Sequence, residues 1–77
     1  MEIPITNLKK GQCAIITRLV GGHHFQSKIR TMGIREGKSI SVIATQPFGG
    51  PVILDLNGRQ ITIGRGMCGR IFVEAVE

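Results

Sequence analysis

The sequence is short of aromatic rings, of acids and of long apolar runs. Its 77 residues include three Phe but neither Trp nor Tyr, and only five acids stand against ten Lys and Arg. A core without large rings must be filled by aliphatic side chains, whose branched members suit the pleated faces of strands. No stretch approaches the roughly 20 apolar residues that cross a bilayer, and the start MEIPITNLKKG has no apolar segment typical of a secretory signal. We therefore expect a cytoplasmic protein with a single domain, residues 1–77.

Cysteine is also scarce, since only Cys13 and Cys68 occur. In the cytoplasm such a pair stays reduced, so we expect no disulfide. Free cysteine is among the most frequently buried residue types. The prediction for both is a small buried hydrophobic residue, not a metal ligand.

What the chain does have is an excess of positive charge, with a formal net charge of +5. This excess is compatible with nucleic acid, an anionic membrane surface or an acidic protein face as partner. The basic residues form no run longer than two, and no aromatic residues alternate with them to stack on bases. A solvated basic surface is therefore favoured, and a nucleic-acid-binding barrel remains a less favoured alternative.

One short helix is predicted near the middle of the chain. Phe25, Ile29 and Met32 have the spacing i, i+4 and i+7, which places them on one side of a helix. Gly33 follows where a left-handed C-terminal cap is expected, and Ile34 then returns to the core. We expect this helix to lie on the rest of the domain as a lid.

Five other segments have the pattern of short strands, and tight turns separate them. The strands are expected at 13–20, 39–45, 52–56, 59–63 and 70–76. Asn57-Gly58 is a strong signal for a two-residue hairpin, and the glycine-rich segment GRGMCG predicts a single 3₁₀ turn before the last strand. Ile3 to Gly11 is interpreted as a lead-in whose Pro4 limits strand pairing. The fold class is thus all-β: a small closed five-stranded barrel with one short helix inserted after the first long strand.

Several of these features together resemble a known family. Ala14 and Ile16 on one face of the first strand, MGIREG at the helix end, the turn PFGGP, and the closing VEAV resemble the ferrous-iron transport protein A (FeoA) family of SH3-like domains. The resemblance covers nearly the whole chain and implies an SH3-like barrel.

Barrels of this type also occur as the C-terminal domains of metal-dependent repressors. In those proteins a DNA-reading helix-turn-helix precedes the barrel, and the 77 residues leave no room for one. We therefore expect a stand-alone transport accessory.

Iron transport raises the question of a metal site, for which His23 and His24 are the weak candidates. Adjacent residues of a helix do not face each other, and the chain contains no CxxC, HxxxH or HxH motif. A metal site needs three or four converging ligands. We assign no metal ligand and expect the two histidines to be solvated. The alternative function is an iron chaperone or sensor that uses these histidines.

The sequence contains no recognisable motif of a catalytic site. No Ser-His-acid or Cys-His arrangement can be assembled, and no GxxxxGK[ST] loop is present to bind phosphate. The acids are scattered: Glu2, Glu36, Asp55, Glu74 and Glu77. We expect neither an enzyme nor a cofactor.

The resemblance implies a small adaptor of ferrous-iron uptake that docks on the cytosolic, GTPase-linked part of the ferrous-iron permease. Through that partner it would reach the inner face of the cell membrane. Pro47 and Phe48 form a stiff tip that could anchor a partner, although Phe48 could instead fold back onto the barrel. Lys28, Arg30 and Arg35 could steer an acidic partner surface. Pairing of the domain with itself stays open.

Overall fold

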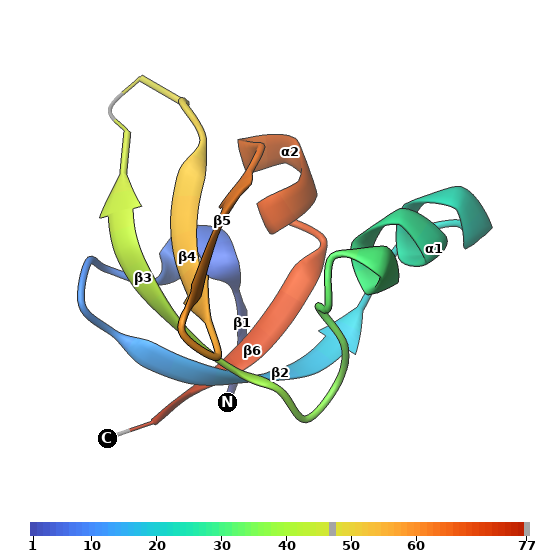
Figure 1. Ribbon diagram of the computed structural model, residues 1–77, viewed down its shortest axis with the longest axis horizontal. Coiled ribbons are helices and arrows are strands. Elements are labelled where there is room, and N and C mark those ends of the chain that lie inside the picture. Colours follow the sequence, from blue (N-terminus) through green and yellow to red (C-terminus); the bar gives the residue numbers. More distant parts are fainter. Residues whose placement is uncertain (47, 77) are drawn as a thin grey trace.

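One antiparallel sheet organises the part of the chain that the computed structural model describes, residues 1–46 and 48–76 (Figure 1). Its strand order is β1-β6-β2-β3-β4-β5. The strands are β1 (Glu2–Pro4), β2 (Cys13–Leu19), β3 (Ser39–Thr45), β4 (Val52–Leu56), β5 (Arg59–Ile63) and β6 (Ile71–Val76). The helices are η1, a 3₁₀ helix (Ile5–Asn7), α1 (His23–Thr31) and α2 (Arg65–Cys68).

The predicted fold class is confirmed in its β-rich character and in the helix that follows the first long strand, but the predicted closed five-stranded barrel is wrong. A sixth strand, β1, pairs with β6, with Glu2 opposite Glu74 and Pro4 opposite Phe72. Pro4 is tolerated there because β1 lies at the edge of the sheet, where a missing N–H interrupts no ladder. β1 and β5 are the two ends of the strand order, so the sheet is open. Figure 1 shows that it is strongly curved.

The core between the curved halves of this sheet is aliphatic. Its buried members are Ile5, Leu8, Ala14, Ile16, Leu19, Ile29, Ile34, Ile40, Val42, Val52, Leu54, Leu56, Ile63, Cys68, Ile71 and Val73. No polar or charged side chain is buried within the described ranges. Burial of these aliphatic side chains stabilises the fold.

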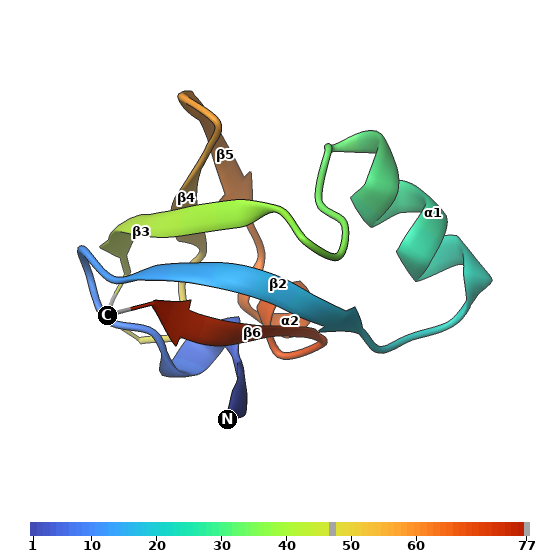
Figure 2. The same ribbon diagram turned by 90° about the horizontal axis from the view of Figure 1, so that it is seen from below.

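Helix α1 packs through the predicted stripe and ends where predicted. Ile29 is fully buried, while Phe25 and Met32 are partly buried against the core. The amide of Ile34 donates to the carbonyl of Ile29 (3.3 Å) and the amide of Gly33 to that of Arg30 (3.0 Å), which is the Schellman pattern. The helix flanks one end of the sheet and does not cover it as a lid (Figure 2).

The glycine-rich segment before β6 differs from the prediction. It forms one α-helical turn, α2, in place of a 3₁₀ turn. The amides of Cys68 and Gly69 donate to the carbonyls four residues earlier, at 3.1 and 3.2 Å. This turn places Cys68 in the core and leaves the side chain of Arg65 free to reach the neighbouring β3–β4 turn.

Candidate functional site

The β3–β4 turn presents the most exposed large apolar side chain of the described residues. Phe48 is fully solvent-exposed and has a φ of 59°, a left-handed conformation that is unusual for a bulky residue. Its alternative, a ring folded back onto the domain, is wrong. Pro47, the other predicted residue of this tip, lies outside the described residues.

Arg65 braces this turn from helix α2. Its Nε donates to the carbonyl oxygen of Gly50 (3.2 Å) and its Nη2 to that of Gln46 (3.0 Å), so one guanidinium holds both ends of the turn. A guanidinium is rigid and planar, and two such bonds fix its orientation. Sequence reasoning missed Arg65, because nothing local indicates that residue 65 lies beside residues 46 and 50.

The basic residues predicted to steer a partner lie on and just after α1. Lys28 and Arg30 are exposed on the helix, and Arg35 is exposed in the following loop. Arg30 forms an ion pair with Glu36, with Nη2 3.2 Å from Oε1. Part of its charge is therefore compensated, whereas Lys28 and Arg35 make no ion pair with a described carboxylate.

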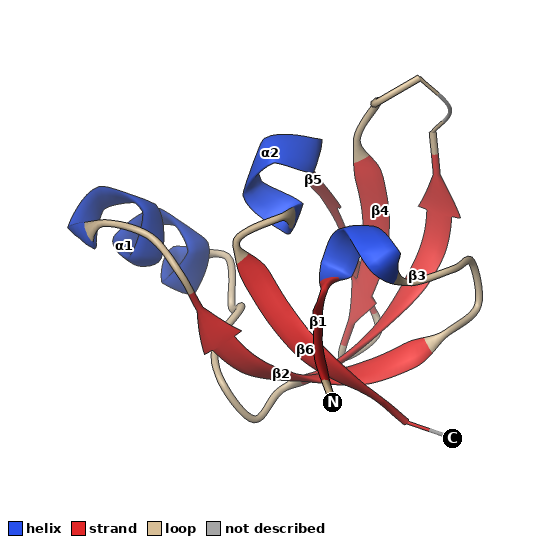
Figure 3. Ribbon diagram, turned by 180° about the vertical axis from the view of Figure 1, so that it is seen from behind, coloured by secondary structure: helices blue, strands red, loops and turns tan. Residues whose placement is uncertain are grey.

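These two groups of predicted partner-binding residues do not form one patch. Helix α1 and the β3–β4 turn project from opposite sides of the molecule, as both Figure 1 and Figure 3 show. A single small contact cannot include both of them. The turn and the basic residues on and after α1 are therefore two separate candidate surfaces.

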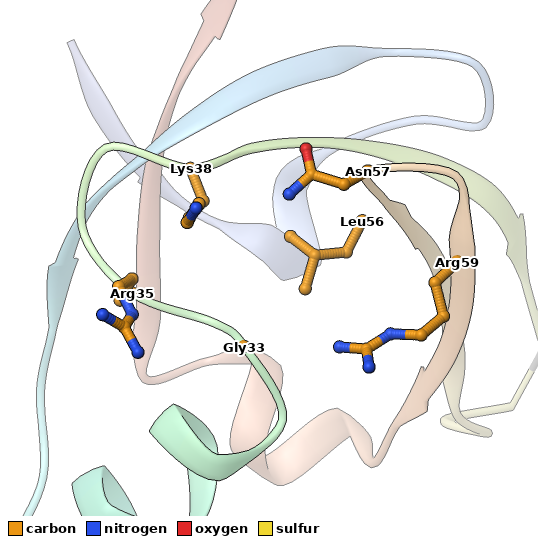
Figure 4. Close-up of a pocket in the computed structure, with 6 residues that line it drawn as sticks. All are labelled: Gly33, Arg35, Lys38, Leu56, Asn57 and Arg59. Carbon is orange, nitrogen blue, oxygen red and sulfur yellow. The ribbon is translucent and has the colours of Figure 1, made fainter.

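A pocket of about 510 Å³ lies between the loop after α1 and the β4–β5 hairpin. Figure 4 shows the residues that line it, Gly33, Arg35, Lys38, Leu56, Asn57 and Arg59. Three of the six are cations, and none is acidic. Of the predicted residues only Arg35 belongs to this pocket.

Arg59 is the most firmly placed cation of the pocket. Its Nη2 donates to the carbonyl oxygen of Met32 (2.8 Å), which ties β5 to the end of α1. Gly33 follows at a φ of 90°, and a Cβ atom there would lie 3.0 Å from that same Nη2 and 3.2 Å from Cδ2 of Leu56. The pocket thus depends on a glycine that leaves space for an arginine.

The histidine pair shows no sign of a metal centre. His23 and His24 are exposed at the start of α1, and their ring centroids lie 6.3 Å apart in an edge-on arrangement. Within residues 1–46 and 48–76, no three His, Cys, Asp or Glu side chains are grouped closely enough to hold a metal ion.

The two cysteines have opposite environments. Cys68 is buried, as predicted, and burial raises the pKa of its thiol to about 11. Cys13 is exposed, so the prediction that it is buried is wrong. It begins β2 on the face opposite to Ala14 and Ile16, and that face points to solvent.

None of the helices in the described part of the chain combines the length and the apolar character needed to cross a bilayer.

Comparisons with known proteins agree along almost the whole chain. The FeoA domain model matches residues 3–75. A protein of Methanocaldococcus jannaschii named "Putative Fe(2+) transport protein A" is 35% identical over 74 residues, which cover 96% of this chain and 88% of the relative.

Solved structures give the same result. The crystal structure of an iron uptake regulatory protein (FeoA) superposes with a TM-score of 0.92 at 32% identity, over 99% of this chain and all of the other. A manganese-dependent transcriptional repressor reaches a TM-score of 0.91 at 16% identity, over 97% of this chain and 37% of the repressor. At that identity the likeness shows a shared fold alone.

Proposed function

The chain belongs to the FeoA domain family, and we propose that it is an accessory protein of ferrous-iron transport that works by docking. Its partner in this proposal is the cytosolic, GTPase-linked part of a ferrous-iron permease, which would bring it to the inner face of the membrane. Support comes from the transport protein A name of its M. jannaschii relative. The aliphatic interior, in which no described polar side chain is buried, also favours binding at the surface.

The observation that carries the docking proposal is the exposed ring of Phe48. Aromatic side chains are enriched among the residues that dominate binding energy, and they act best when a rigid segment presents them. Arg65 supplies that rigidity through its bonds to the carbonyls of Gln46 and Gly50. The left-handed backbone of Phe48 turns the ring away from the domain and makes it available to a hydrophobic pocket on a partner.

The basic residues near α1 have a different part in the proposal. The net charge of the whole chain is +5. Lys28 and Arg35 contribute to it, together with Arg30, whose charge is partly compensated by Glu36. Charges outside the contact change the rate of association more than the final affinity. They would steer the domain toward an acidic partner surface, and the Phe48 turn would hold it there.

The test compares Phe48→Ala with Val20→Ala, which shortens another exposed apolar side chain (40% exposed) at the end of β2. Binding to the immobilised cytosolic region of the permease is measured by biolayer interferometry. Loss of an anchor should weaken the affinity about tenfold or more for Phe48→Ala. Val20→Ala should leave it unchanged. Because the ring buries nothing in its own domain, the thermal unfolding midpoint of Phe48→Ala should equal that of the wild type.

Equal affinities for the wild type and Phe48→Ala would remove this turn from the interface. The steering role is tested with a separate variant, Lys28→Gln. This variant should lower the association rate at low salt and leave the dissociation rate unchanged. A slower association that persists at high salt would contradict the steering role.

A further inference from the structure

We propose that the pocket between the loop after α1 and the β4–β5 hairpin binds a phosphate monoester or a diphosphate group. This proposal goes beyond the docking function: the pocket does not include Phe48, shares only Arg35 with the docking residues, and could be occupied with or without a protein partner. It assigns a ligand to Lys38, Asn57 and Arg59, which have no part in the docking proposal.

The positive charge of the pocket is not compensated by acidic side chains. Arg35, Lys38 and Arg59 line one volume of about 510 Å³ without a carboxylate. None of the three forms an ion pair with an acid in the described part of the chain, whereas nearby Arg30 is paired with Glu36. Cations held close together repel one another, and an anion between them converts that repulsion into attraction.

The side chain of Arg59 is already held in place by a hydrogen bond within the domain. One of its five N–H donors is used on the carbonyl of Met32, which fixes the guanidinium toward the pocket and leaves donors for a ligand. Figure 4 shows Arg59 reaching across from the hairpin toward the loop that carries Arg35 and Lys38. This hydrogen bond orders part of the Arg59 side chain before binding, so a ligand bears less of that entropy cost.

The arrangement of donors in the pocket favours a phosphate group over a carboxylate. A carboxylate offers two oxygens in one plane and a single charge, and one arginine fork satisfies it. The pocket places three cations and the amide of Asn57 on different sides of one space. A phosphate monoester has three terminal oxygens and close to two negative charges at neutral pH, which suits several donors that converge from different directions.

Pyrophosphate is the probe, titrated into the ¹⁵N-labelled protein at constant ionic strength while amide shifts are followed by NMR. We expect saturable shifts confined to residues 33–38 and 56–59. Lys38→Gln and Arg35→Gln should each weaken binding about tenfold, because a charge-assisted hydrogen bond is worth slightly more than the roughly 1.4 kcal/mol of a factor of ten. Both side chains are exposed, so the fold should survive. Lys28→Gln, which removes the same charge outside the pocket, is the matched control and should bind as the wild type does.

Flotation with vesicles that contain phosphatidic acid, a lipid phosphate monoester, identifies the source of the group. Flotation that is lost in Lys38→Gln would indicate a lipid headgroup, and pyrophosphate binding without flotation would indicate a soluble phosphate compound. The proposal is overturned if no saturable shift occurs up to about 10 mM pyrophosphate, or if Lys28→Gln weakens binding as much as Lys38→Gln. It is also overturned if a poly-glutamate peptide saturates the same amides and pyrophosphate does not.

Discussion

Alanine at Gly33 should destabilise the domain more than alanine at Gly37, although the two glycines have almost the same positive φ angle. Their φ angles are 90° and 89°. A Cβ atom at Gly37 would meet nothing within 4 Å, whereas one at Gly33 would lie 3.0 Å from Nη2 of Arg59 and 3.2 Å from Cδ2 of Leu56. Comparison of the two alanine variants therefore separates the cost of backbone strain from the cost of crowding in the pocket.

The size of each effect follows from these contacts. A left-handed conformation costs an L-residue about 1–2 kcal/mol, and alanine recovers about 0.4–1 kcal/mol by restricting the unfolded chain. Gly37→Ala should thus lower the free energy of unfolding by about 1 kcal/mol. Gly33→Ala must also displace Arg59 from the carbonyl of Met32, so it should lose about 1 kcal/mol more.

Urea unfolding followed by circular dichroism measures both values, and thermal unfolding provides a second reading. In a domain of this size 1 kcal/mol shifts the midpoint by about 4–8 °C. The part of the crowding that comes from Arg59 should vanish in an Arg59→Ala background, which leaves only the contact with Cδ2 of Leu56. Equal losses for Gly33→Ala and Gly37→Ala would refute the claim that Gly33 leaves space for Arg59.

Three further predictions follow from other contacts. A thiol reagent at pH 8 should label Cys13 rapidly and Cys68 only in denaturant, because burial raises the pKa of the Cys68 thiol to about 11; rapid double labelling of the folded protein would contradict this. Arg65→Ala should lower the free energy of unfolding by about 1 kcal/mol and speed amide exchange near residues 46–50; unchanged exchange there would show that Arg65 does not brace the turn. Hydrogen bonds from Thr17 and Arg18 lower the pKa of the Glu2 carboxyl in the folded state. The ionised carboxylate therefore stabilises the fold above the ordinary pKa of glutamate, and this stabilisation is lost as the pH falls through the lower pKa of the folded state. The stability difference between the wild type and Glu2→Gln should therefore shrink from about pH 5 to pH 3, and a constant difference would contradict the assignment.

Local patterns predicted the strands and the end of α1 because the deciding interactions are local. The Asn57-Gly58 hairpin forms with left-handed φ angles of 55° and 85°, as that dipeptide indicates. Gly33 ends the helix by hydrogen bonds to residues within the preceding turns.

The errors came from average tendencies that conflict with position. The general burial of cysteine predicts Cys13 in the core. In a strand, however, the alternation that places Ala14 and Ile16 inward directs Cys13 outward. Pro4 predicts limited strand pairing, yet proline is compatible with an edge strand, and the sequence alone does not tell which strand is an edge.

The candidate sites were only partly predictable. Phe48 was identified from its glycine- and proline-rich turn. The brace from Arg65 and the pocket formed by residues 33–38 and 56–59 depend on segments that meet only in the folded chain. No local pattern indicates such contacts.

The docking claim is tested most directly by adding the permease's unlabelled cytosolic region to the ¹⁵N-labelled domain and mapping which amides change. The largest changes should fall on residues 48–50 and on Arg65, with smaller, salt-sensitive changes near Lys28 and Arg35. Changes centred on β1 and β6, with the amide of Phe48 unaffected at saturation, would contradict it.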